Sequence, residues 1–252
     1  MQLLLANAKT MYSHTDSLPW SLPSFQTVAN RLAAEMSTYD IGQLAQMLDC
    51  SMKLAADNWQ RYQNFFDTSK IPAIMAYNGQ AYKHLKAYSL ESDALEFAQN
   101  HLWITCFLYG LLRPMDGIVP YRMEHCTCLR ETGGRPVSGF WKNQLTDFLI
   151  RNVQEDDGWL IHLSTEEYQH LFDWKRIIQE VKVIQPLFYT AQRDGSLKMQ
   201  AVWAKSCRGA MVRYILTRHI SHPEELQGFE YEGFQYDPSL GEEAFPHFIR
   251  TA

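Results

Sequence analysis

Short apolar runs alternate along this chain with longer segments in which apolar residues recur at helical spacing. Residues 2–6 (QLLLA) form a continuous apolar run that predicts a buried strand. Residues 24–36 have the period of an amphipathic helix, with Ser24 as the expected N-cap, and residues 40–66 are also helical in period. Residues 71–77 (IPAIMAY) return to strand character. The first third of the chain therefore predicts both helices and strands.

A longer helix is expected to begin near a cap at Ser92. Its apolar positions would fall on one face, and Gly110 and Pro114 would end it. The residues expected on that face are Leu95, Ala98, Leu102, Cys106 and Tyr109. The following segment, residues 109–125, would then be the exit from a buried helix.

The second half of the chain continues the mixture. Residues 122–131 alternate like a strand, a helix is expected from Ser138, and residues 159–163 (WLIHL) predict a further strand. Residues 181–204 predict two strands around an Asp194-Gly195 turn, with Pro186 at a bulge or edge. Interleaved helices and strands with a hairpin indicate a mixed α/β (α+β) class with a mixed sheet. We expect one compact domain spanning residues 1–252, since no linker divides it.

Composition narrows the functional classes. The five cysteines have no regular spacing, which favours a reducing compartment, most simply the cytoplasm, and the first residues resemble neither a signal peptide nor a membrane span. The net charge of −5 disfavours non-specific attraction to polyanions or anionic membranes. Any nucleic-acid binding must therefore come from a local basic patch.

Residues 109–125 (YGLLRPMDGIVPYRMEH) hold two arginines, two acids and two prolines in a short turn-rich segment. Prolines fix the backbone and glycine allows close approach, so the segment predicts a rigid loop that positions charge. Its charged residues are Arg113, Asp116, Arg122 and Glu124.

A second candidate lies at residues 201–216 (AVWAKSCRGAMVRYIL), which predict a strand followed by a helix capped by Ser206. Helical spacing then places Arg208 on the buried face, with Lys205 at the strand end. One interpretation is a structural ion pair between Arg208 and Asp116 or Glu124. The other is an anion site at the helix N-terminus, where Gly209 would let a ligand approach the backbone. That site would combine Lys9, Arg113, Arg122, Lys205 and Arg208, supported by Thr10, Gly110, Asp116, Glu124 and Gly209.

Other candidate chemistry is weaker. Glu124, His125, Cys126 and Cys128 could be considered as metal ligands, but the usual paired spacings are missing, so buried strand cysteines and no metal or other cofactor are expected. The run of residues 164–167 (STEE) is typical of a helix start with acids in its first turn rather than a catalytic acid pair.

Several blocks resemble the YaaA peroxide-stress family. They recur in the family's order, as ANAKT (6–10), LYGLLRPMD (108–116), PYRME (120–124), FW (140–141), LSTEEY (163–168), AKSCRGAM (204–211) and EGFQYD (232–237). The resemblance implies a cytosolic bacterial protein of the hydrogen-peroxide response that keeps free iron low and limits oxidative damage. It also implies a positively charged cleft linked to DNA, and a helix-hairpin-helix element matching residues 95–116. The sequence departs from the family at Gly110, which stands alone where the hairpin has two glycines, and at Gln80, where an aspartate is expected.

Two classes of function follow. In the first, the five cations contact DNA phosphates; in the second, an enzyme's basic pocket binds a small anionic or nucleobase-like substrate. A cation-lined groove open at both ends would suit a duplex, whereas a closed pocket with acids near Lys205 would suit chemistry. The sequence alone leaves both open.

Overall fold

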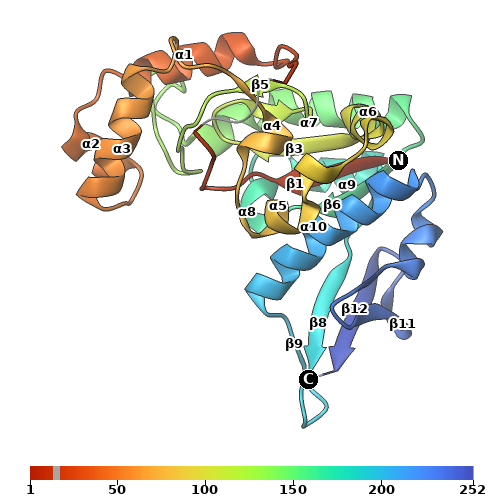
Figure 1. Ribbon diagram of the computed structural model, residues 1–252. Coiled ribbons are helices and arrows are strands. Elements are labelled where there is room, and N and C mark those ends of the chain that lie inside the picture. Colours follow the sequence, from red (N-terminus) through yellow and green to blue (C-terminus); the bar gives the residue numbers. More distant parts are fainter. Residues whose placement is uncertain (14–17, 252) are drawn as a thin grey trace.

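The computed structural model describes residues 1–13 and 18–251, and a five-stranded mixed sheet lies at its centre (Figure 1). The strand order is β4-β3-β1-β6-β7. Strands β3, β1, β6 and β7 are mutually parallel, and β4 runs antiparallel to β3. Their bounds are β1 (Gln2–Ala6), β3 (Leu102–Cys106), β4 (Gly110–Leu112), β6 (Trp159–Leu163) and β7 (Lys182–Ile184).

A second five-stranded sheet is built from the C-terminal part of the chain, in the order β10-β11-β12-β8-β9. Strands β8 and β12 are parallel, and the other pairs are antiparallel. The bounds of these strands are β8 (Leu187–Ala191), β9 (Leu197–Lys198), β10 (Glu230–Tyr231), β11 (Phe234–Glu242) and β12 (Phe245–Thr251). A separate antiparallel pair is formed by β2 (Ile71–Pro72) and β5 (Gly117–Ile118). Pro186 lies where the chain passes from one large sheet to the other.

Helices cover the central sheet and separate it from the second sheet (Figure 1). Helix α10 packs against α5 on one side and against β8 on the other. The α-helices are α1 (Gln26–Met36), α2 (Ile41–Met47), α3 (Met52–Gln63), α4 (Ala73–Ala76), α5 (Gln80–Leu85), α6 (Ser92–His101), α7 (Val137–Glu155), α8 (Glu166–Gln169), α9 (Trp174–Glu180) and α10 (Ala201–Arg218). Short 3-10 turns cover Ala87–Ser89 and Pro223–Gly228. Among the described residues, no helix combines the length and apolar character that a membrane crossing requires.

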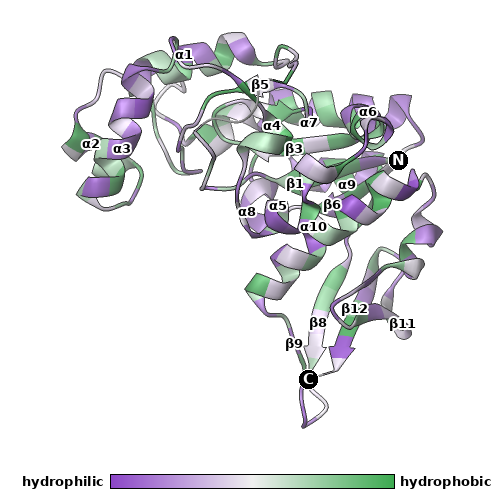
Figure 2. Cartoon of the chain, in the orientation of Figure 1, coloured by the Kyte–Doolittle hydropathy of each residue, from purple (hydrophilic) through white to green (hydrophobic). Residues whose placement is uncertain are grey.

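Helix α10 is buried on two sides, which explains why its hydrophobic and hydrophilic residues are intermixed (Figure 2). At Gly209 the helix touches α5 so closely that a Cβ atom would lie 1.8 Å from the carbonyl oxygen of Ala81. The expected role of Gly209 in admitting a ligand is therefore wrong: this glycine admits the backbone of α5. The close contact sets how closely α10 and α5 approach each other.

The mixed α/β class, with its mixed central sheet flanked by helices, is confirmed. So are the strand at 159–163, the helix beginning near Ser138, and the hairpin around Asp194-Gly195, where Gly195 has φ +82°. The helical prediction for residues 40–66 is confirmed as two helices, because Asp40 and Ser51 each cap a separate N-terminus.

Several local predictions are wrong. Ser24 does not cap α1, whose N-cap position is Phe25. Residues 71–77 form only a two-residue strand before α4. Residues 122–131 form no named strand, and Cys126 and Cys128 are exposed rather than buried. Apolar alternation here reflects side chains that pack from an irregular loop.

The helix predicted over residues 92–109 ends at His101, with Glu91 rather than Ser92 as its N-cap. The next five residues form the fully buried strand β3, because aromatic and β-branched side chains suit a strand that is covered on both faces. Gly110, at φ +72°, makes the turn into β4. Residues 95–116 therefore form helix, strand, turn and strand, and the helix-hairpin-helix expected here is absent from this segment.

Candidate functional site

A cavity with a volume of about 950 Å³ opens at the carboxyl ends of β1 and β6. The chain leaves β1 toward β3 and leaves β6 toward β7, so these neighbouring strands diverge at this edge. Open α/β sheets bind ligands at such a switch point. The cavity also has the size typical of small-molecule sites.

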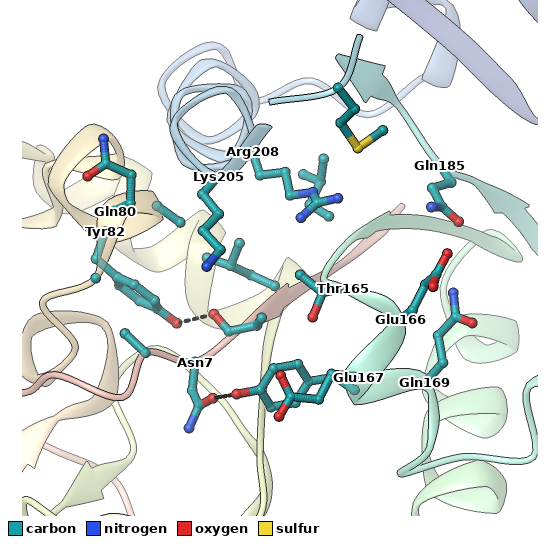
Figure 3. A pocket seen from close by; sticks show the side chains of 18 of the residues that line it. Asn7, Gln80, Tyr82, Thr165, Glu166, Glu167, Gln169, Gln185, Lys205 and Arg208 are labelled. Atoms are coloured by element: carbon teal, nitrogen blue, oxygen red, sulfur yellow. Dashed lines mark hydrogen bonds between the residues drawn. The ribbon is translucent and has the colours of Figure 1, made fainter. Parts of the chain in front are cut away.

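Two cations enter the cavity from α10. Lys205 is exposed and Arg208 is partly buried, and both side chains point toward the centre of the pocket (Figure 3). Within the described chain, neither residue forms an ion pair or a side-chain hydrogen bond. Burial lowers the pKa of Arg208, while Cys207 and the charge of Glu166 oppose that shift. The two cations therefore face the pocket without a direct ion-pair partner among the described residues.

Two acids occupy the opposite side. Glu166 and Glu167 begin α8, directly after β6, and lie across the cavity from the two cations (Figure 3). Thr165 occupies the N-cap position of α8, but its side chain makes no capping hydrogen bond. The prediction of acids in a first helical turn is confirmed, although these acids also line the pocket.

The floor of the cavity is held by a network around Asn7, the first residue after β1. The Asn7 amide donates to the Tyr121 hydroxyl at 3.0 Å and accepts a hydrogen bond from the Tyr168 hydroxyl. Tyr82, on α5, donates to the Ala6 carbonyl oxygen at 3.0 Å (Figure 3). Because both ends of the Asn7 amide have partners, its orientation toward the cavity is fixed.

Gln80 lies on the α5 side of the cavity. Its amide nitrogen donates to the Ser206 hydroxyl at 2.9 Å and lies 3.1 Å from His84 Nε2. Ser206 is therefore not the cap of α10: it lies inside the helix, and its hydroxyl bonds the Val202 carbonyl oxygen as well. Gln80 supplies a neutral amide where the family resemblance leads one to expect a carboxylate.

The remaining wall is apolar and comes from the second sheet and the segment before α10. Leu187 and Tyr189 of β8 contribute to it. At its rim, Phe245 is 43% exposed and Met199 is 40% exposed. Exposed apolar side chains at the mouth of a cavity offer a surface for the apolar part of a ligand.

Of the other expected cations, only Lys9 lines this cavity. Its ammonium group is 2.7 Å from Glu124, whose other carboxylate oxygen is 2.8 Å from Arg122. Arg122 and Lys9 thus share the single carboxylate of Glu124. Thr10 also lines the cavity, and its hydroxyl donates to the Asn78 carbonyl oxygen at 2.7 Å.

Arg113 lies at the opposite edge of the central sheet. Its guanidinium stacks over Trp103 at 3.3 Å and donates to Gln2, at the start of β1. The expected convergence of Arg113 with Lys205 and Arg208 is therefore wrong. Asp116 is likewise structural: its carboxylate accepts from the Arg113 backbone amide and the Ser21 hydroxyl, each at 2.8 Å.

The alternative ion pair between Arg208 and Asp116 or Glu124 is also absent from the described residues. Arg208 instead acts electrostatically on His162, a buried residue of β6. Burial first, and then the charge of Arg208, lower the pKa of His162 to about 3. The residues expected as possible metal ligands do not assemble, since no group of three or more His, Cys, Asp or Glu suited to a metal occurs in the described part of the chain.

Sequence reasoning missed most of the polar residues that line the cavity. They are Asn7, Tyr82, Thr165, Glu166, Glu167, Tyr168, Gln169, Gln185 and Tyr189. Several follow β1 or β6 directly, and position after a buried strand was a usable signal for them, as it was for Lys9. Lys205 and Arg208 reach the same edge from a helix interior, rather than from a strand end as expected.

The fold and the cavity define a mixed α/β protein with a charged, ligand-sized pocket at the switch point of its central sheet. A family model described as peroxide stress protein YaaA matches residues 1–240. The chain belongs to this family, which confirms the resemblance read from its motifs.

Curated relatives match over almost the whole chain. A UPF0246 protein of Porphyromonas gingivalis is 42% identical over 259 residues, covering 99% of this chain and 99% of its own. A UPF0246 protein of Bacteroides thetaiotaomicron is 39% identical over 253 residues, covering 99% and 98%. A UPF0246 protein of Hahella chejuensis is 34% identical over 257 residues, covering 99% of each chain.

Proposed function

We propose that this peroxide stress protein acts in the cytoplasm by binding a small anionic ligand in the cavity between α10 and α8. The observation that carries the proposal is the pair of cations, Lys205 and Arg208, which face the cavity without a carboxylate partner among the described residues. Arg208 is partly buried, so its charge without an ion-pair partner is costly, and an anionic ligand would offset that cost.

The geometry favours a small ligand over a duplex. Glu166 and Glu167 face the same cavity and would repel the phosphates of a continuous backbone. Facing acids and cations in one pocket also suit proton transfer, so the bound ligand could be a substrate. Lys205 and Arg208 would then hold its anionic group.

A thermal-shift titration with inorganic phosphate and pyrophosphate tests this proposal. We expect a rise in the melting temperature of the wild-type protein and a reduced rise for Lys205→Ala and Arg208→Ala. Lys142→Ala, at an exposed position on α7 outside the cavity, is the matched control and should respond as wild type. An equal response of all four proteins would contradict the proposal.

DNA binding is the second candidate, and the α2–α3 pair is the observation that favours it. These consecutive short helices are joined by four residues, among which Asp49 has φ +44°, a conformation common just after a helix ends. However, Asp40, Asp49 and Asp57 outnumber the cations Lys53 and Arg61 in this pair. Phosphate contacts here would rest on backbone amides more than on charge.

Salt-dependent binding of a labelled duplex separates the candidates. If DNA is the ligand, log K should fall linearly with log salt, and each lost phosphate contact should reduce the slope by about 0.9. Lys53→Ala would then weaken duplex binding without affecting phosphate-induced stabilisation. Duplex binding in the absence of any stabilisation by small anions would establish the DNA candidate instead.

The proposal includes the cellular outcome that the family resemblance implies, which is less free iron and less oxidative damage. If the pocket is responsible, cells that carry only Lys205→Ala protein should lose peroxide resistance and show raised chelatable iron. Cells that carry Lys142→Ala protein should behave as wild type. If cells with normal amounts of the Lys205→Ala protein kept normal peroxide resistance, the pocket would not be responsible for that resistance.

A further inference from the structure

The cavity carries opposite charges on facing walls. Lys205 and Arg208 enter from α10, and the carboxylates of Glu166 and Glu167 enter from α8 (Figure 3). No ion pair within 4.0 Å joins these two walls in the described chain. A ligand that was only anionic would satisfy one wall and face repulsion from the other. The complementary ligand therefore carries an anion at one end and hydrogen-bond donors at the other.

The apolar wall of the cavity indicates which chemical group of the ligand lies between its anionic end and its donor end. Tyr189 and Leu187 line the cavity, and Phe245 and Met199 leave apolar surface exposed at its mouth. Aromatic and thioether side chains pack well against a flat ring. At about 950 Å³, the space exceeds what inorganic phosphate alone would fill.

We propose that the ligand is a nucleoside monophosphate whose base carries an exocyclic amino group. The phosphate would lie against Lys205 and Arg208, and the base would pack on the apolar wall. The amino group would donate to the carboxylates of Glu166 and Glu167, as the amino groups of cytosine and adenine donate to polar side chains elsewhere. This inference rests on the proposed function, because it names the ligand class of the same pocket.

Asn7 adds a fixed polar group to the floor. Its amide oxygen and nitrogen are already oriented by Tyr168 and Tyr121, so its remaining N–H group can donate to a ligand without reorganisation. A donor of this kind suits a ring nitrogen or a carbonyl oxygen of the base. Glu166 and Glu167 would still distinguish bases that carry an amino group from bases that carry a carbonyl oxygen.

Calorimetric titration with two matched pairs of nucleotides tests the inference. CMP differs from UMP, and AMP from IMP, by an amino group in place of a carbonyl oxygen. We expect CMP and AMP to bind about tenfold more tightly than UMP and IMP, since a hydrogen bond to a carboxylate is lost in the latter. In the Glu166→Gln/Glu167→Gln double variant the difference should shrink to less than about threefold. Glu96→Gln, at an exposed position on α6 outside the cavity, should preserve it.

The inference would be overturned if the two nucleotides of each pair bound with equal affinity. It would also be overturned if ribose 5-phosphate, which lacks a base, bound as tightly as CMP and AMP. If that equal binding still depends on Lys205 and Arg208, the proposed anion pocket stands and only the amino-bearing base is wrong. If none of these phosphates binds, both the inference and the proposed function fail.

Discussion

Two charged regions of this molecule look alike in sequence but differ in how their charges are used. In the loop of residues 109–125, Arg113 stacks on Trp103, Asp116 holds the loop backbone, and Arg122 pairs with Glu124. On α10, by contrast, Lys205 and Arg208 face a cavity and form no ion pair within the described residues. Charges that the protein pairs internally stabilise the fold, whereas unpaired charges at a cavity are available to a ligand.

The largest effect on stability is expected when the contact between α10 and α5, which positions the α10 cations, is disrupted. Gly209→Ala would force a methyl group against the Ala81 carbonyl oxygen, so we expect a loss of about 3 kcal/mol or more in the free energy of unfolding. Gly139→Ala on α7 is the matched control, because its added Cβ would meet no heavy atom within 4 Å outside the adjoining residues and the backbone of its own helix. That change should be neutral or stabilise by about 0.5–1 kcal/mol. Chemical denaturation of both variants measures the difference, and equal stabilities would contradict the close contact.

The second largest effect on stability is expected in the loop of residues 109–125, whose charges are engaged within the protein. Asp116→Ala removes the acceptor for the Arg113 amide and the Ser21 hydroxyl, so we expect a loss of about 2–3 kcal/mol in the free energy of unfolding. Ligand binding per folded molecule should be unchanged. A stable Asp116→Ala protein that had lost ligand binding would reverse the roles assigned to the two regions.

The structural role of this loop could not be read from its composition. The prolines and glycine predict a rigid loop but not the direction in which Arg113 points, which depends on β3. The sequence predicts helix where β3 forms, because the apolar residues between Leu102 and Cys106 satisfy both helical and buried-strand patterns. Once Leu102–Cys106 pairs with β1, Arg113 faces the start of β1 and not its carboxyl end.

The cations of α10 were identified for a reason that proved partly wrong. Arg208 stood out as a charge on a face expected to be buried, and that anomaly is real. The expected helix start at Ser206 was wrong, because α10 begins five residues earlier, at Ala201. Glu166 and Glu167 escaped notice as pocket residues because long-range packing, and not local pattern, brings α8 opposite α10. Local sequence patterns thus indicate the ends of the strands but not the wall that α8 forms opposite α10.

Two buried groups, His162 of β6 and Asp116 of the 109–125 loop, should give pH dependences of opposite sign. His162 has its pKa lowered to about 3, so the unfolded chain binds the extra proton between about pH 3 and 6.5 and stability falls on acidification. Burial raises the pKa of Asp116 to about 6, so its contribution to stability falls as pH rises from 3.8 toward 6.

Denaturation between pH 4 and 6 measures these slopes. His162→Phe should remove up to about 1.4 kcal/mol per pH unit from the dependence of the free energy of unfolding on pH. Asp116→Asn should change the slope in the opposite direction. Unchanged slopes in both variants would show that neither group is buried as described.

The smallest effect on stability is expected when Lys205, the exposed cation of α10, is replaced. Lys205→Ala should change the free energy of unfolding by no more than about 0.5 kcal/mol, since Lys205 is exposed and makes no ion pair within the described residues. Thermal melting without ligand measures this change. A loss of several kcal/mol would indicate a structural partner.

The central claim is that unpaired cations bind the ligand while paired arginines support the fold, and equilibrium binding of pyrophosphate to four single variants tests it most directly. Calorimetry should show at least about a tenfold loss of affinity for Lys205→Ala and Arg208→Ala, because each removes a charged contact. Arg113→Ala and Arg122→Ala should bind within about twofold of wild type at a temperature where all four remain folded, since both guanidinium groups are engaged elsewhere. The reverse pattern, with affinity lost in the loop variants and retained in the α10 variants, would contradict the account.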